Sequence, residues 1–498
     1  MDTQSIPLVS GFARAALLAV ALLPISVWAL SPQEAQSMIE RAQVGAEADS
    51  HGALTLPELM KALGVPGVSV AIVQDYEIHW ANAYGVADIE TGEPVDTQTL
   101  FQAASISKPV AAMASLLAVQ QGKFALDDNV NSILTSWQLD GEGMTERRAV
   151  TPAGLMSHTS GLGDAFGFPG YEPGEALPTT IQILEGTPPS NVRRIFMERE
   201  PGVAYEYSGG GVTLQQLVLT DVRKKAFAQI MRDDVLGPLG MNNSTYEQPL
   251  PADWAAKAAR AHSGDGESMG PKWHVYPELA AAGMWTTPSD LARFAIEVQR
   301  SVRGESNRVL DVDHARRMIT PVGVGSFAIG LAVERIGEGW YFSHGGANWG
   351  FRADVVGHLS NGYGLAIMTN SDSGGTVINE ITKRVQHAYD WDAIAEPVPR
   401  GYRAIDREVV MLPRDELAKF VGVYTGEETL TVSLGDNGLL VRNSSGGRDA
   451  PLYASSTTGF FLKVMPVTMD FVLKDSKVTG MILVTPDGEE LALEREGE

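Results

Sequence analysis

The hydrophobic pattern of this 498-residue chain changes character after Ala395. Before that residue, stretches with helical spacing of apolar side chains alternate with short β-rich runs. From Leu412 onward short strand-like runs dominate, such as Thr429–Leu434, which is followed by an Asp-Asn-Gly turn. The intervening residues 396–400 (EPVPR) have the composition of a linker. We therefore predict a large mixed α/β part followed by a small antiparallel β-barrel or sandwich.

The expected organisation has four segments. Residues 1–29 are predicted to be a signal peptide, residues 30–395 the larger domain, residues 396–411 the linker and residues 412–498 the β-rich domain. At roughly 100–200 residues per domain, this length is sufficient for two to four domains. Because the chain contains no cysteine, both domains must be stabilised by packing rather than by disulfides.

The first 29 residues have the features of an export signal. Arg14 precedes an uncharged run over residues 15–30, and small residues at positions 27 and 29 suit cleavage after Ala29. A retained membrane anchor is the alternative, but the run is shorter than the ~20 residues that a spanning helix needs. We expect cleavage, no stable membrane span in the mature chain, and a periplasmic or secreted location.

Charge and residue composition exclude several classes of function. A net charge of −23 repels phosphate backbones, so nucleic acid is not an expected partner. Without cysteine there is no thiol nucleophile, and a structural zinc or iron–sulfur site is not expected. The nine histidines form no His-Glu-x-x-His pattern, and we expect neither a metal nor another cofactor. The expected partner is a small-molecule or peptide substrate, and the sequence leaves the oligomeric state open.

One segment has the residue types of an activated nucleophile. A serine hydroxyl needs a base within hydrogen-bond reach, and Ser105 is followed three residues later by Lys108 at the start of a strongly predicted helix. Residues three apart share one face of a helix, and the N–H groups of a helix N-terminus can stabilise an oxyanion. A lysine base must be neutral, which burial and nearby positive charge promote. Ser-x-x-Lys occurs once in the chain.

Two further motifs follow in the sequence. Tyr207 lies in the run YEYSGGG, and His344 begins HGGA between two strand-like runs. In this order the three motifs resemble those of the superfamily of class C β-lactamases and D-Ala-D-Ala carboxypeptidases, which includes esterases and D-amino-acid peptidases. The resemblance covers about residues 50–392. Other matching stretches are LMSHTSGL (155–162), GPLGMNNSTY (237–246) and AAGMWTTPSDLARF (281–294).

The resemblance implies a fold, a reaction and residue roles. The fold would be α/β (α+β), with an antiparallel five-stranded sheet flanked by helices and an all-helical lobe. The reaction would be acylation followed by hydrolysis. Ser105 would be the nucleophile, Lys108 its general base and Tyr207 the proton shuttle. His344 would replace the family's lysine on the substrate-facing strand, where Gly346 lets the substrate backbone approach.

The resemblance also implies an oxyanion hole, and it contains one departure. The N–H groups of Ser105 and Ala347 would form the hole, while Gly345 and Gly209 would belong to the substrate-binding surface. The family motif is Tyr-x-Asn, whereas Gly209 occupies its third position here, and Tyr-x-Asn occurs nowhere in the chain. The family's asparagine contacts the substrate amide. Its loss favours an ester, or a D-amino-acid or cell-wall peptide, over a β-lactam.

Three features have alternative interpretations. Tyr205 is the alternative to Tyr207, but Tyr207 alone is followed by Ser-Gly. His158 lies in a segment that resembles a structural part of the family, so we predict a packing role for it. Residues 266–270 fit the Gly-x-Ser-x-Gly nucleophile elbow around Ser268, but that elbow needs a buried strand before it. The preceding residues are polar, so we predict a loop.

The leading hypothesis is a serine hydrolase that acts as an esterase or as a D-amino-acid or cell-wall peptidase. One alternative is a true β-lactamase. Another is a non-catalytic protein that binds penicillin or peptidoglycan peptides. An inert relative would be expected to lose its serine, lysine or tyrosine. Because Ser105, Lys108 and Tyr207 are all present, the sequence favours an enzyme.

Overall fold

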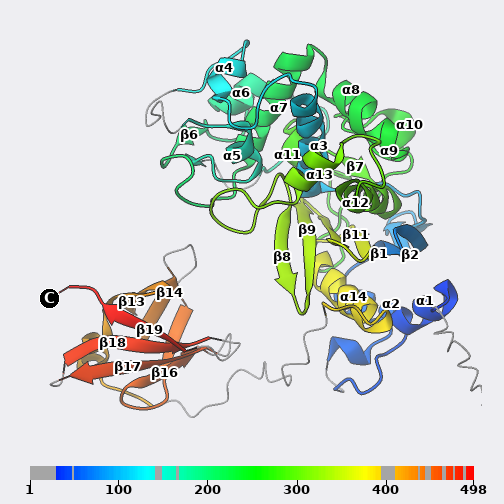
Figure 1. Cartoon of the computed structure of the whole chain (residues 1–498). Helices are drawn as coiled ribbons and strands as arrows, with labels where there is room; N and C mark the ends of the chain where they lie inside the picture. Colours follow the sequence, from blue (N-terminus) through cyan, green and yellow to red (C-terminus); the bar gives the residue numbers. More distant parts are fainter. Residues whose placement is uncertain are drawn as a thin grey trace, which may run out of the picture. The chain divides into compact units, whose positions relative to one another are not determined.

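The computed structural model divides the chain into two compact units, Met1–Ile394 and Ala395–Glu498. In Figure 1 the first unit runs from blue to yellow and the second is orange to red. The predicted signal peptide and most of the predicted linker lie outside the described residues, so these two boundaries stay predictions. The structure describes residues 30–47, 50–140, 149–163, 168–393, 410–435, 438–443, 450–462, 467–474, 477–485 and 490–497.

A seven-stranded antiparallel sheet forms the centre of the first unit. Its strands are β1 (Gly67–Gln74), β2 (Glu77–Asp88), β3 (Glu93–Pro94), β8 (Ala332–Ile336), β9 (Gly339–Asn348), β10 (Phe351–His358) and β11 (Gly364–Thr369). The spatial order is β3-β2-β1-β11-β10-β9-β8, so the first strand pairs with a strand about 300 residues later, and Val68 aligns with Thr369. The antiparallel sheet was predicted, and it has seven strands where the resemblance implied five.

Helices cover both faces of this sheet (Figure 1). The covering helices are α1 (Pro32–Glu40), α2 (Leu56–Ala62), α12 (Pro288–Val302) and α14 (Gly374–Ala388). Alternate residues of a strand point to opposite faces. Val68, Val70 and Ile72 of β1 accordingly pack in a core with α1, α2 and α14, whereas Ala71 and Val73 pack against α12.

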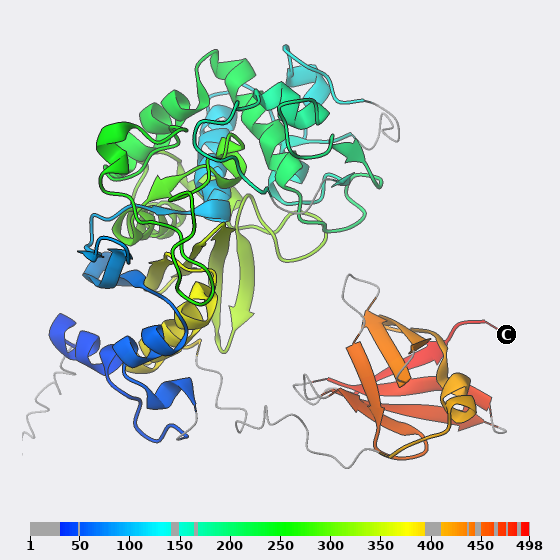
Figure 2. The ribbon, with the colours of Figure 1, turned by 180° about the vertical axis from the view of Figure 1, so that it is seen from behind.

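The remainder of the first unit is a lobe built mainly from helices, shown from behind in Figure 2. Eleven of the fourteen residues of α3 are buried, as expected for a central helix that is covered on all sides. Within the described residues, no helix is both long enough and apolar enough to cross a bilayer. The α-helices are α3 (Ser107–Gln120), α4 (Val130–Ile133), α5 (Pro152–Met156), α6 (Thr180–Glu185), α7 (Gly209–Arg223), α8 (Phe227–Met231), α9 (Gly237–Leu239), α10 (Ala252–Ala255), α11 (Leu279–Ala282) and α13 (Val312–Met318).

Short elements join these helices, so the lobe is not purely helical. Two small sheets pair β4 with β7 and β5 with β6. Their bounds are β4 (Phe101–Gln102), β5 (Leu162–Gly163), β6 (Phe196–Met197) and β7 (Trp285–Thr286). The 3₁₀ turns η1 (His51–Ala53) and η2 (Ala104–Ile106) and the π-helical turn η3 (Arg232–Leu236) complete the first unit.

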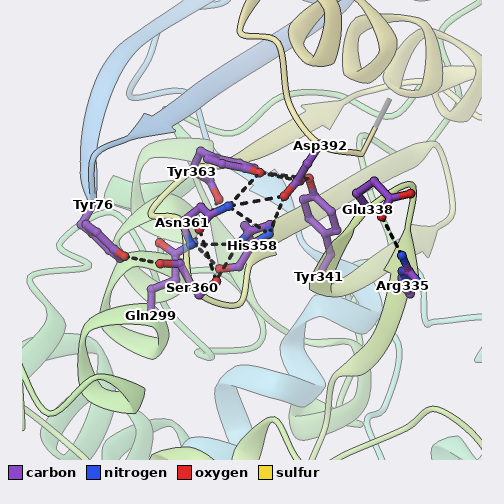
Figure 3. Close-up of polar contacts among 10 residues, drawn as sticks. All are labelled: Tyr76, Gln299, Arg335, Glu338, Tyr341, His358, Ser360, Asn361, Tyr363 and Asp392. Atoms are coloured by element: carbon purple, nitrogen blue, oxygen red, sulfur yellow. Dashed lines mark hydrogen bonds and ion pairs between the residues drawn. The ribbon is translucent and has the colours of Figure 1, made fainter. Parts of the chain in front are cut away.

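A polar cluster fixes the last described residues of the first unit to its sheet (Figure 3). The carboxylate of Asp392 accepts hydrogen bonds from the hydroxyls of Tyr341 and Tyr363. It also lies 3.2 Å from His358 Nε2. His358 Nδ1 accepts from the N–H groups of Ser360 and Asn361, at 3.0 and 2.8 Å, so Nε2 carries the proton that faces Asp392.

The second unit is a closed antiparallel barrel of eight strands. Its core is apolar and includes Phe460, Met469 and Phe471. The barrel closes where β19 pairs with β12, which leaves no unpaired edge strand. The prediction of a small antiparallel β domain is confirmed, and the structure selects a barrel over a sandwich. The elements are α15 (Arg414–Leu417), η4 (Ala418–Phe420), β12 (Gly422–Thr425), β13 (Thr429–Gly435), β14 (Gly438–Asn443), β15 (Ala450–Ala454), β16 (Gly459–Leu462), β17 (Thr468–Lys474), β18 (Lys477–Val484) and β19 (Glu490–Arg495).

Candidate active site

Ser105 lies in the turn η2, two residues before α3 begins. The preceding Ala104 has a φ of 49°, which is uncommon for a residue with a side chain, so the backbone turns sharply at this point. Ser107 holds the turn: its Oγ donates to the carbonyl of Ala104 at 2.6 Å and accepts from the N–H of Met284 at 3.0 Å. This turn directs Ser105 into a cleft while α3 itself stays buried.

Lys108 lies one turn further and points back at Ser105. Its Nζ is 2.9 Å from Ser105 Oγ, and it donates to the carbonyl of Ala281 at 2.8 Å. The residue is only 4% exposed, so water has little access to it. The ring of Tyr207 lies with its centroid 4.9 Å from the same Nζ. The three residues that the sequence grouped are therefore close together in space.

Tyr207 is positioned by the N-terminus of α7. Ser208 is the N-cap of this helix, and its Oγ accepts from the N–H of Gly211 at 2.9 Å. The N–H of Ser208 donates to His158 Nδ1 at 3.2 Å. Gly209, the first residue of α7, lines the cleft without a side chain. Gly209 stands at the third position of the Tyr-x-Asn motif, so this position presents no side-chain amide to the cleft.

His158 is a neighbour of the site that the sequence did not reveal as one. Its ring is almost completely buried and lies with its centroid 4.2 Å from that of Tyr207. Burial, followed by the nearby charge of Lys108, lowers the pKa of His158 well below its usual value, so the ring is neutral. The predicted packing role of His158 is therefore to support the Tyr207 ring. The sequence alone could not reveal this contact, because His158 and Tyr207 are far apart in the chain.

β9 presents unpaired backbone to the cleft. β8 pairs with β9 from Gly339 to Ser343, whereas β10 pairs along the opposite edge as far as Asn348. Residues 344–348 thus have one edge without a strand partner in the described structure. A Cβ on Gly346 would lie 2.2 Å from the carbonyl oxygen of Ala103, so β9 approaches the Ser105 turn more closely than any side chain would allow.

His344 is a buried, neutral member of this strand. Burial, and then the charge of Lys108, lower its pKa to about 3. Its Nδ1 donates to the carbonyl of Gly345 at 2.6 Å, which leaves Nε2 as the unprotonated nitrogen, and this atom has no partner within the described residues. His344, which the sequence resemblance placed where the family has a lysine, supplies no positive charge to the cleft.

The cleft has a volume of about 730 Å³, within the usual range for small-molecule sites. Every site residue that the sequence predicted lines it: Ser105, Lys108, Tyr207, Gly209, His344, Gly345, Gly346 and Ala347. Tyr205, the alternative tyrosine of the YEYSGGG run, also lines the cleft. Residues outside any motif add to the wall, among them Phe168, Asn348, Arg352, Asp354 and Asn379. Tyr205 stacks on Phe327 at a centroid distance of 5.3 Å, so part of the wall is aromatic.

A sequence model of the family described as Beta-lactamase matches residues 54–389. The chain belongs to the Beta-lactamase family. Penicillin-binding protein 4* of Bacillus subtilis (strain 168) is 22% identical over 450 residues, which cover 85% of this chain and 94% of that protein. Family membership confirms the resemblance drawn from the three sequence motifs. It supports a hydrolase in general terms and does not specify the bond that is cleaved.

Solved structures of similar fold extend over much of the chain. The structure of SurE with D-Leu is 23% identical, covers 91% of this chain and 100% of its own, and has a TM-score of 0.56. The D-amino acid amidase from Ochrobactrum anthropi SV3, complexed with L-phenylalanine, is 24% identical, covers 66% of this chain and 94% of its own, and has a TM-score of 0.52. These similarities support the fold described here.

One feature that a sequence pattern suggested lies outside the site of this Beta-lactamase family member. Ser268 lies in an irregular segment, joined to His262 by an isolated β-bridge, and it does not line the cleft. The Gly-x-Ser-x-Gly pattern at residues 266–270 therefore does not form a nucleophile elbow. Within the described residues, no group of three or more histidine, aspartate or glutamate side chains could hold a metal ion.

Glu278 is a second buried group with no sequence signal. It directly precedes α11, the helix whose Ala281 carbonyl holds Lys108. The Glu278 side chain is fully buried, and neither carboxyl oxygen has a hydrogen-bond partner within the described residues. Burial raises its pKa from the ordinary value of 4.5 to about 7.

We expect Glu278→Gln to change how stability depends on pH. Between pH 4.5 and about 7 the folded protein holds a proton on Glu278 that the unfolded chain has lost, so stability falls as pH rises through this window. The parent should lose on the order of 3 kcal/mol relative to the variant across it. Denaturant unfolding from pH 4.5 to 8 measures this difference. The exposed Glu93→Gln is the control, and a constant gap between Glu278→Gln and the parent would contradict the prediction.

Proposed function

We propose that this protein is a serine hydrolase that cleaves an ester or amide bond through an acyl-enzyme on Ser105. The observation that carries this proposal is the 2.9 Å separation of Lys108 Nζ from Ser105 Oγ at a buried position in the cleft. A nucleophile with a base in hydrogen-bond contact, next to a strand edge that has no strand partner in the described structure, suits acyl transfer. Membership of the Beta-lactamase family supports the same reaction class.

Acylation begins when Ser105 Oγ attacks the carbonyl carbon of the substrate. Lys108 accepts the hydroxyl proton, and the carbonyl oxygen becomes an oxyanion. The N–H groups of Ser105 and Ala347 stabilise that charge. As the oxyanion collapses, the bond to the leaving group breaks, and Tyr207 passes a proton to the leaving group from Lys108.

Deacylation repeats these steps with water. A water molecule attacks the acyl carbon and gives up one proton through Tyr207 and Lys108. The ester bond to Ser105 Oγ then breaks, the proton returns to Ser105, and the acid product leaves. His158 supports this path by packing against the Tyr207 ring, which lies 4.9 Å from Lys108 Nζ.

The charges and side chains of the cleft favour substrates without a carboxylate or an acylamido arm. Neutral His344 offers no positive charge to a carboxylate, and Gly209 offers no amide to an acylamido group. We propose activated or short-chain esters as the preferred class. Amides and peptides of D-amino acids are the second candidate, because the solved structures of similar fold include a complex with D-Leu and a D-amino acid amidase.

We also propose that the protein acts in the bacterial periplasm or outside the cell. This proposal depends on the pattern of Arg14, the uncharged run that follows it and the small residues before position 30. Fractionation of cells that express the full chain, with N-terminal sequencing of the product, tests it. A mature protein beginning at Leu30 in the periplasm or medium is the expected result, and an intact chain in the cytoplasm would contradict it.

A side-by-side comparison of substrates tests the proposed function. We expect p-nitrophenyl acetate or butyrate to exceed nitrocefin and ampicillin in kcat/KM by at least ~10-fold, which is about 1.4 kcal/mol of transition-state stabilisation. D-leucine and D-alanine amides belong in the same panel. A kcat/KM for nitrocefin that equals or exceeds the ester value would identify a β-lactamase instead. Binding of penicillin without turnover of any substrate would identify a non-catalytic binding protein.

A further inference from the structure

The cleft continues past the unpaired edge of β9 to β10 and α14, where its lining includes Asp354, Gly375 and Asn379. Two glycines keep this part open. A Cβ on Gly345 of β9 would meet nothing nearer than the carbonyl of Ala353 at 3.9 Å, and a Cβ on Gly375 of α14 would meet nothing within 4 Å. Neither glycine fills the space between β9 and α14, which therefore remains a hollow.

Asp354 borders this hollow from β10. It aligns with Gly345 in the β9–β10 pair, and aligned residues project to the same face with Cβ positions about 5 Å apart. Because Gly345 has no side chain, the β9 residue aligned with Asp354 does not cover its carboxylate. The backbone N–H of Val355 donates a hydrogen bond to that carboxylate, and within the described residues no cationic side chain forms an ion pair with it. Burial raises the pKa of Asp354 to about 7, since no neighbouring positive charge compensates for the loss of water.

The two cations that line the same cleft as Asp354 are already held by other groups. Arg352 lies on the same face of β10, but its guanidinium pairs with Asp372 at 2.9 Å and donates to the carbonyl of Asn348 at 2.8 Å. Lys108 is bound to Ser105 and to the carbonyl of Ala281. The lining residues from α14 carry no charge. Within the described residues, Asp354 is thus a carboxylate at the wall of the cleft without an ion-pair partner, and it can pair with a cationic ligand.

We propose that Asp354, with Asn379 on α14, forms a subsite for a cationic group of the substrate, such as an ammonium or a guanidinium. This inference deepens the proposed function, because it assigns a charge to part of the substrate that Ser105 would attack. A bound cation would offset the cost of a half-buried carboxylate that has no counter-ion. Neutral His344 adds no charge that would repel it.

Equilibrium binding of a matched pair of ligands tests the subsite without any need for turnover. Choline and 3,3-dimethylbutan-1-ol have the same shape, and only choline is charged. At pH 8, calorimetric titration of the parent should show choline binding about tenfold tighter, and Asp354→Asn should reduce this preference to about twofold or less. Because Asp354 gains a proton near pH 7, the preference of the parent should also weaken at pH 6.

Glu334→Gln is the matched control. Glu334 is an exposed carboxylate on the neighbouring β8, outside the residues that line the cleft, and its loss changes the net charge by the same amount. This variant should keep the preference for choline. Equal affinities for the two ligands in the parent, or an equal loss in Glu334→Gln, would overturn the subsite.

Turnover of two matched thioesters separates this inference from the proposed function. Acetylthiocholine should exceed S-(3,3-dimethylbutyl) thioacetate in kcat/KM in the parent by about tenfold. Asp354→Asn should lose most of that advantage, whereas Glu334→Gln should keep it, and a melting curve checks that Asp354→Asn is folded. Hydrolysis with no charge preference would reject the subsite alone. Absence of hydrolysis would reject the proposed function, and the binding experiment would still decide the subsite.

Discussion

Ser105→Ala should abolish covalent labelling by a fluorophosphonate and lower ester turnover by at least ~10⁴-fold. The alanine variant has no atom that can form the acyl-enzyme, and catalytic groups that act as a unit lose nearly all activity when the nucleophile is removed. The η2 turn should survive, because Ser107 rather than Ser105 holds it. Gel fluorescence, steady-state rates and a melting curve measure the three effects.

Ser268→Ala is the matched control for this variant. Ser268 lies outside the cleft in an irregular segment, although it has the sequence pattern of a nucleophile elbow. Its substitution should leave labelling and turnover unchanged. Labelling that persists in Ser105→Ala and disappears in Ser268→Ala would move the nucleophile to the second serine.

Lys108→Ala and Tyr207→Phe should each lower kcat by at least ~10²-fold, the scale of lost general acid–base catalysis. Lys108 Nζ lies 2.9 Å from Ser105 Oγ and 4.9 Å from the centre of the Tyr207 ring, so both residues are assigned to one proton path. The losses should therefore not add in the double variant. Steady-state rates of the two single variants and the double variant measure this coupling.

Tyr205→Phe is the control for Tyr207. Both tyrosines line the cleft, but the Tyr205 ring stacks on Phe327 and is not the ring that lies over Lys108. Removal of its hydroxyl should cost less than about threefold. Full additivity of Lys108→Ala and Tyr207→Phe would show that the two residues do not share one proton path. An equal loss in Tyr205→Phe would contradict the specific role of Tyr207.

The central residues of the candidate site could be predicted because local sequence encodes their spacing. Ser105 and Lys108 are one helical turn apart, and a single pattern contains both. Other parts of the site depend on contacts that no local pattern encodes. His158 reaches Tyr207, and Asp354 reaches the hollow over Gly345, through tertiary packing that residue types alone do not specify.

Local sequence also predicts only part of the fold. Thr429–Leu434 alternates in hydrophobicity and forms a strand as predicted, whereas Glu490–Arg495 (ELALER) has the composition of a helix and forms β19. Pairing with β18 and with β12 closes the barrel and outweighs the local propensity of this segment. The central pairing of β1 with β11 also joins segments about 300 residues apart, which no local pattern could reveal.

Trapping of the acyl-enzyme tests the central claim most directly. The mature protein would be mixed with p-nitrophenyl acetate or butyrate, quenched in acid during turnover, and measured by intact mass followed by peptide mapping. The account predicts a mass increase of one acyl group on the peptide that contains Ser105, and the loss of this species as the substrate is consumed. An acyl group on a different residue, or ester turnover with no covalent species at any quench time, would contradict it.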